Sequence, residues 1–76
     1  MTQIQKLIEK FKKQPSTVQW KDLEKIIKHN GYRLERIKGS HHIYSKENED
    51  PIIAPVHNGE IKIPYKKRFR KQIYNI

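Results

Sequence analysis

The sequence predicts an α+β fold in which a three-stranded antiparallel sheet is covered on one face by helices. Apolar residues recur with the spacing of a helical stripe over residues 4–11 and again over residues 20–27. Between residues 32 and 56 they come instead in short runs separated by turn-forming residues, as in strands. Helical spacing then returns over residues 64–73. Because a sheet needs its apolar face covered, we expect the second and the last helix to pack on it.

The first segment is predicted to be an amphipathic helix. Pro15 ends its pattern, because proline cannot continue a helix interior. We expect residues 1–15 to form an N-terminal helical extension and residues 16–76 to form the main domain. The apolar stripe of the extension consists of Ile4, Leu7, Ile8 and Phe11. Its other sides carry Lys6, Lys10, Lys12 and Lys13.

A second helix is predicted to follow a short connector at residues 14–17. Thr17 is its expected N-cap, because a threonine hydroxyl accepts hydrogen bonds from the free N–H groups at a helix start. Asn30-Gly31 supplies a left-handed C-terminal stop. The apolar stripe in between consists of Trp20, Leu23, Ile26 and Ile27.

Three short strands are predicted next. In the first, Tyr32 and Leu34 alternate with Arg33 and Glu35, which is typical of a half-buried strand. A turn at residues 38–40 leads into a second strand over residues 41–45, so the pair forms a hairpin. After a polar, acidic turn, residues 52–56 form the third strand, and Pro55 places this strand at an edge of the sheet.

The last helix begins near Pro64 and carries Tyr65, Phe69 and Ile73 on one face. Its other face is strongly cationic, with no acidic neighbour to balance the charge. Two interpretations remain open: a solvated face of an amphipathic helix, or a ridge that binds phosphates. The cations of this face are Lys66, Lys67, Arg68, Arg70 and Lys71.

Composition limits the classes of function. The 76 residues contain 17 Lys and Arg against 8 Asp and Glu, and this net charge of +9 suits a nucleic acid, an acidic protein or an anionic surface as partner. There is no cysteine, which excludes disulfides and thiolate chemistry. The sequence shows neither the apolar run of a signal peptide nor the roughly 20 apolar residues of a membrane span. We therefore expect a cytoplasmic location and no membrane association.

Two adjacent histidines, His41 and His42, are candidates for proton transfer, since histidine is the side chain best suited to it near neutral pH. Gly39 permits the close approach of a phosphate, and the Ser40 hydroxyl offers a donor. One histidine with cations nearby suffices for RNA cleavage without a metal, in which a deprotonated 2′-hydroxyl attacks the adjacent phosphorus. Alternatively, both histidines are ordinary packed or solvated strand residues.

Strand geometry separates the two histidines, because successive side chains of a strand point to opposite faces. If Ile43 belongs to the core, His41 lies on its side of the sheet. His42 and Tyr44 then form the exposed pair, suited to catalysis or to stacking on a base. No metal site and no cofactor are expected, because the histidines, His57 included, lack the spacing of zinc ligands.

Two ordered segments, LEKIIKHNGYRLERIKGSHHIY and PVHNGEIKIPYKKRFRKQI, make up most of the chain after Trp20. Together they resemble the HicA-type toxins, small ribonucleases of bacterial toxin–antitoxin pairs. The resemblance implies a double-stranded-RNA-binding-domain-like α-β-β-β-α fold, metal-independent cleavage of mRNA and neutralisation by a cognate HicB-type antitoxin. The catalytic histidine of the family follows Gly-Ser directly, which corresponds to His41 here, and His42 remains the second candidate.

The leading hypothesis is therefore a toxin ribonuclease with His41, or else His42, as general acid or base. Two other functions stay open: a non-catalytic RNA-binding module with strongly salt-dependent affinity, and a basic domain that meets an acidic protein partner. The residues expected to contact RNA are Lys38, Gly39, Ser40, Tyr44, Lys66, Lys67, Arg68, Arg70 and Lys71.

Overall fold

The computed structural model describes residues 2–76 and confirms the predicted order of elements. An α-β-β-β-α arrangement follows an additional N-terminal helix, so the predicted α+β class is also confirmed. The elements are α1 (Gln3–Lys13), a short 3₁₀ turn η1 (Pro15–Thr17), α2 (Trp20–His29), β1 (Arg33–Lys38), β2 (His41–Ser45), β3 (Ile52–Pro55) and α3 (Ile63–Tyr74).

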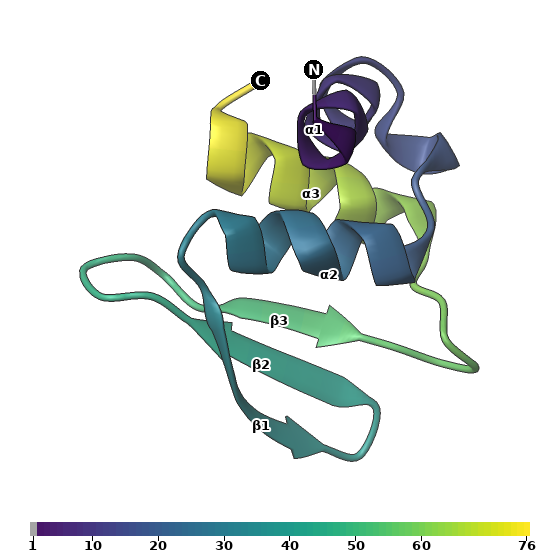
Figure 1. Cartoon of the computed structure of the whole chain (residues 1–76). Helices are drawn as coiled ribbons and strands as arrows, with labels where there is room; N and C mark the ends of the chain where they lie inside the picture. Colours follow the sequence, from purple (N-terminus) through teal and green to yellow (C-terminus); the bar gives the residue numbers. More distant parts are fainter. Residues whose placement is uncertain (1) are drawn as a thin grey trace.

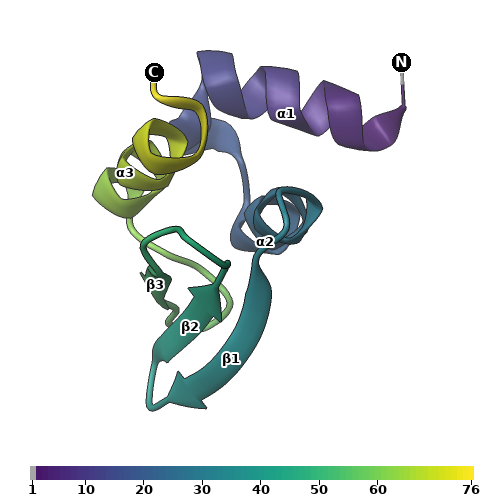
Figure 2. The ribbon, with the colours of Figure 1, turned by 90° about the vertical axis from the view of Figure 1, so that its left-hand side faces the viewer.

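The sheet is an antiparallel meander with the strand order β1-β2-β3. This order makes β3, with its Pro55, an edge strand, as predicted. The helices α2 and α3 lie over one face of the sheet, and α1 lies on the far side of these two helices (Figure 1). Within residues 2–76, no element covers the other face of the sheet (Figure 2).

The core lies between the sheet and the helices. From the sheet, Tyr44, Ile52 and Ala54 are completely shielded from solvent. They pack with the apolar stripes that periodicity predicted for the three helices. The buried helical members of this core are Phe11, Trp20, Leu23, Ile26, Ile27 and Phe69.

The start of α2 differs from the prediction. Thr17 does not cap this helix, because its hydroxyl donates to the carbonyl oxygen of Gln14 at 2.8 Å and closes the η1 turn instead. The N-cap is Gln19, which makes no side-chain capping hydrogen bond. Pro15 explains the shift, since it starts a 3₁₀ turn that has to end before the α-helix begins.

The helix α1 shares the core of the rest of the chain. Phe11 is fully buried and meets the ring of Tyr74 edge-on, with 6.4 Å between the centroids. The end of the helix is tied down as well, because Arg70 Nη1 donates to the carbonyl oxygen of Lys12 at 2.8 Å. The N-terminal helix therefore packs on α3 rather than standing free.

A β-bulge interrupts β1. Leu34 lies opposite Tyr44 and Arg36 lies opposite Ile43, so Glu35 is an extra residue and the predicted alternation breaks there. The strand is also exposed along its whole length, not half-buried. Because residues directly opposite in antiparallel strands share a face, the register defines the face that no helix covers. This open face carries Arg33, Arg36, Lys38, His41, Ile43, Ser45, Ile53 and Pro55.

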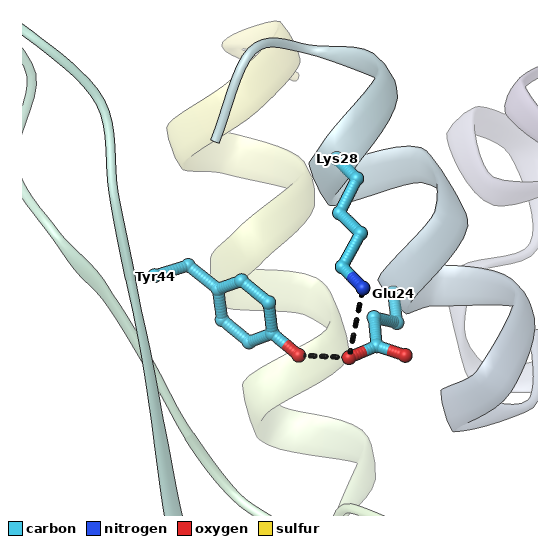
Figure 3. Close-up of polar contacts among 3 residues, drawn as sticks. All are labelled: Glu24, Lys28 and Tyr44. Atoms are coloured by element: carbon cyan, nitrogen blue, oxygen red, sulfur yellow. Dashed lines mark hydrogen bonds and ion pairs between the residues drawn. The ribbon is translucent and has the colours of Figure 1, made fainter. Parts of the chain in front are cut away.

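Tyr44 joins the sheet to α2 by a polar contact (Figure 3). Its buried ring meets Trp20 edge-on, with 6.1 Å between the centroids. Its hydroxyl donates a hydrogen bond to Glu24 Oε2, and the same oxygen lies 3.8 Å from Lys28 Nζ. Burial first, and then the hydrogen bond and charge of Glu24, raise the pKa of Tyr44 above its usual value of 10.0.

We expect Tyr44→Phe to lower the free energy of unfolding at neutral pH by about 1.5 kcal/mol. Phenylalanine keeps the packing of the ring but loses the hydrogen bond to the Glu24 carboxylate. Because Glu24 is 30% exposed, water replaces part of this hydrogen bond, which limits the loss of stability. Urea denaturation measures the difference. Lys28→Gln is the matched control, since it removes only the exposed partner of Glu24 and should change stability by less than about 0.5 kcal/mol. Equal stability of Tyr44→Phe and wild type would mean that the hydrogen bond from Tyr44 to Glu24 does not stabilise the fold.

A second readout of the same substitution is its pH dependence. A tyrosine whose pKa is raised by folding stabilises the native state below the pKa of the unfolded chain, and this contribution is lost as the pH rises toward the folded value. Because the pKa of Tyr44 is raised from 10.0, wild type should lose stability more steeply than Tyr44→Phe above about pH 10. The gap between the two unfolding free energies should therefore narrow at alkaline pH, and a constant gap would contradict this.

Candidate active site

His41 begins β2 and belongs to the open face, which points away from the helices. Its cross-strand neighbours are Lys38 in β1 and Pro55 in β3. Opposite residues of antiparallel strands have Cβ atoms about 5 Å apart, so the Lys38 ammonium can reach a group that is bound at His41. The His41 side chain is exposed. An accessible imidazole beside a lysine suits proton transfer on an anionic substrate.

His42 faces the helix side. It lies opposite Ile37 and Ala54, and its ring meets Trp20 edge-on with 6.0 Å between the centroids. The side chain is half-buried, and its Nδ1 atom has no hydrogen-bond partner. The prediction that His42 is the exposed histidine is wrong, because Ile43 belongs to the open face and not to the core.

Tyr44 shares the inward face with His42. The predicted exposure of its ring, on which stacking against a base depended, is also wrong: the ring is fully buried and its hydroxyl is bonded to Glu24. A phenol is readily buried when its hydroxyl has a partner, and α2 supplies that partner. RNA contact by Tyr44 does not fit this position.

The turn before His41 is fastened to the end of β3. The Val56 N–H donates to the Ser40 carbonyl oxygen at 2.7 Å. Gly39 has a φ of +60°, which suits glycine in a two-residue hairpin turn. Chain neighbours aside, no atom lies within 4 Å of the place where a Cβ of Gly39 would stand. The structure thus brings Lys38, Gly39 and Ser40 together with His41, and leaves the backbone open to an approaching group.

A small cavity near the start of α3 is lined in part by Pro55, the cross-strand neighbour of His41. Its volume is about 80 Å³, and it is lined by Pro55, His57, Lys62 and Tyr65. The backbone of His57 exchanges hydrogen bonds of 2.8 and 3.0 Å with Glu60, which closes the intervening turn. The spacing of residues in the sequence does not predict that His57 or Lys62 lines this cavity. The signal in the sequence that could have pointed to the cavity is the Pro-Val-His segment at the end of β3.

The helix α3, which carries a group of cations, lies over the face of the sheet opposite to the open face (Figure 1). Two of them hold other parts of the chain: Arg70 contacts the end of α1, and Lys66 Nζ lies 3.4 Å from the carbonyl oxygen of Ser16. The helix therefore lies on the other side of the sheet from the face that carries His41. The exposed members of the group are Lys67, Arg68 and Lys71.

Within residues 2–76, no group of three or more His, Asp or Glu side chains is placed to hold a metal ion. In the same part of the chain, every helix is too short or too polar to cross a membrane.

Comparison with known proteins identifies a family. The family model described as HicA toxin of bacterial toxin-antitoxin matches residues 20–73. The match includes α2, the three strands and nearly all of α3, and it leaves α1 outside. Neither the curated proteins nor the solved structures gave a match. Both histidines, the Gly-Ser turn and the small cavity lie inside the matched segment.

Proposed function

Because this chain belongs to the HicA toxins of bacterial toxin–antitoxin systems, we propose that it is a ribonuclease that cleaves mRNA with His41 as its catalytic residue. One observation carries the choice of residue: His41 is exposed on the open face opposite Lys38, whereas the neighbouring His42 is turned toward Trp20. A substrate that approaches the open face meets only the first of the two imidazoles.

In the proposed reaction, His41 takes the proton from the 2′-hydroxyl of a nucleotide. The 2′-oxygen forms a bond to the adjacent phosphorus, and the bond from this phosphorus to the 5′-oxygen of the next nucleotide breaks. The leaving 5′-oxygen takes a proton from water, and the hydroxide that remains takes the proton from the His41 imidazolium, which restores the neutral histidine. The upstream product ends in a 2′,3′-cyclic phosphate. Lys38 stabilises the negative charge that develops on the phosphate oxygens. The open backbone at Gly39 and the Ser40 hydroxyl bind the same phosphate.

The proposal keeps the exposed cations of α3 as secondary RNA contacts, on a surface separate from His41. Lys66 and Arg70 would reach RNA only by giving up their contacts with the backbone of Ser16 and Lys12. The exposed cations are Lys67, Arg68 and Lys71.

The partner in this proposal is a HicB-type antitoxin. A toxin of this class acts in a pair with an antitoxin. The net charge of +9 favours a partner with an acidic contact surface. A partner that covers His41 and Lys38 would suffice to stop cleavage.

Purified protein should cut a long RNA of mixed sequence in the presence of a metal chelator, and the fragments should carry 2′,3′-cyclic phosphates. Gel electrophoresis and mass spectrometry of the fragment ends measure both results. DNA of the same sequence is the control and should stay intact, because it lacks the attacking 2′-hydroxyl. RNA that is bound but remains intact would favour the non-catalytic binding module. Loss of cleavage on chelation would contradict the metal-independent mechanism.

A further inference from the structure

We propose that single-stranded RNA reaches His41 along the open face of the sheet, where Arg33, Arg36 and Lys38 of β1 bind successive phosphates. This inference names the substrate-binding surface of the proposed ribonuclease and rests on that function. It assigns the principal RNA contacts to β1 instead of to α3, whose cations are the more conspicuous group in the sequence.

The β-bulge at Glu35 is what gathers the cations of β1. In a regular strand, Arg33 and Arg36 would point to opposite faces, because they are three positions apart. The extra residue changes this, so that Arg33 lies opposite Ser45 and Arg36 opposite Ile43. Both arginines are thereby placed on the face of His41. Lys38, directly opposite His41, completes the row at the catalytic end.

The three side chains of this row are accessible. All of them are exposed, and the ion pair that the structure records within residues 2–76 joins Lys28 to Glu24 on α2. Glu35 is the one acidic residue among the six of β1, so the strand keeps an excess of positive charge. These cations can therefore meet an external anion without first breaking an ion pair.

Spacing and surface chemistry favour RNA backbone as the occupant. Alternate positions of a strand are about 7 Å apart, which is comparable to the separation of successive phosphates in an extended single strand. Beside the cations, the open face presents the apolar side chains of Ile43 and Ile53, the latter 48% exposed. No Phe, Tyr or Trp belongs to the open face, because Tyr44 is turned inward. Binding should therefore depend strongly on salt and only weakly on base sequence.

The test uses full-length protein and a fluorescent 2′-O-methyl RNA of mixed sequence, which binds but cannot be cut because its 2′-oxygen is blocked. Anisotropy titrations at several salt concentrations give the slope of log K against log salt. Arg33→Gln combined with Arg36→Gln should reduce the steepness of this slope by about 1.4, since each phosphate contact to a single strand contributes about 0.7. Both arginines are exposed, so circular dichroism should show an unchanged fold.

Lys6→Gln combined with Lys13→Gln is the matched control. It removes the same two charges from exposed positions of α1, on the far side of the helix layer from the sheet, and should leave the slope nearly unchanged. A slope that falls as much for the α1 pair as for the β1 pair, or that the β1 pair does not change, would overturn the inference. The same holds if the β1 pair binds RNA normally but loses affinity for an acidic protein partner.

The two proposals fail in different ways. If wild type cleaves RNA while the β1 pair leaves the slope unchanged, the open-face track is wrong and the ribonuclease stands. If wild type leaves ordinary RNA intact but the β1 pair still lowers the slope, the track stands as the surface of an RNA-binding module. Wild type that does not bind the 2′-O-methyl RNA at all would overturn the track.

Discussion

His41→Ala should lower RNA cleavage by at least about 100-fold, the usual contribution of a general acid or base. The imidazole is the group proposed to take the proton from the 2′-hydroxyl, and alanine cannot replace it. Folding should be nearly unaffected, because the side chain projects from the open face and packs against no helix. RNA affinity should also be close to that of wild type, since Lys38 and the arginines of β1 remain. Cleavage rate, circular dichroism and 2′-O-methyl RNA binding measure the three expectations.

His42→Ala is the matched control and should show the opposite pattern. It removes a half-buried ring that meets Trp20, so the protein should be less stable but should still cleave RNA. Expression of the variants in cells gives a parallel readout. Wild type and His42→Ala should stop growth and degrade mRNA, whereas His41→Ala should do neither. An active His41→Ala together with a folded but inactive His42→Ala would transfer the catalytic role to His42.

Phe11→Ala should lower the free energy of unfolding by about 3–5 kcal/mol, the range for truncating a buried aromatic side chain. Phe11 is fully buried between α1 and the end of α3, where its ring meets Tyr74. The hydroxyl of Tyr74 in turn accepts a hydrogen bond from Asn30 Nδ2 at 2.9 Å. A chain of this length has a total stability of roughly 4–11 kcal/mol, so the loss would bring the protein close to unfolding. Urea denaturation measures it.

Ile4→Ala is the control on the same helix. Ile4 is only half-buried near the start of α1, so its truncation should cost less than half as much as that of Phe11. A loss below about 1 kcal/mol for Phe11→Ala would mean that α1 is a dispensable attachment to the matched family segment. The expected large loss would show instead that the core of this protein extends beyond the family segment at both ends, since residues 20–73 include neither Phe11 nor Tyr74.

The residues that stabilise the fold and the residues proposed to bind and cleave RNA lie on opposite faces of the sheet. The side toward the helices carries Tyr44 and His42, and the open side carries His41 with the cations of β1. Substitutions on the open side should therefore change RNA binding and cleavage with little effect on folding, while those on the helix side should do the reverse. The comparison of His41→Ala with His42→Ala tests this division directly.

The sequence by itself determined the order of elements, the buried stripe of each helix and the edge position of β3. These features depend on local rules: helical stripes repeat every 3.6 residues, proline stops helices, and proline in a strand belongs at an edge. Each of them follows from neighbours within a few positions along the chain. The choice of His41 over His42 rests instead on the family resemblance, and it stays a prediction.

Only the tertiary structure decided which face of β2 is buried, and the choice reversed the expectation from Ile43. Tyr44 is buried because Glu24, twenty positions earlier in the chain, lies where it can accept the hydrogen bond of its hydroxyl. The bulge at Glu35 likewise depends on how β1 pairs with β2, and it alone places Arg33 and Arg36 on one face. The side of a strand that a residue faces depends on partners distant in the sequence, so a local pattern cannot determine it.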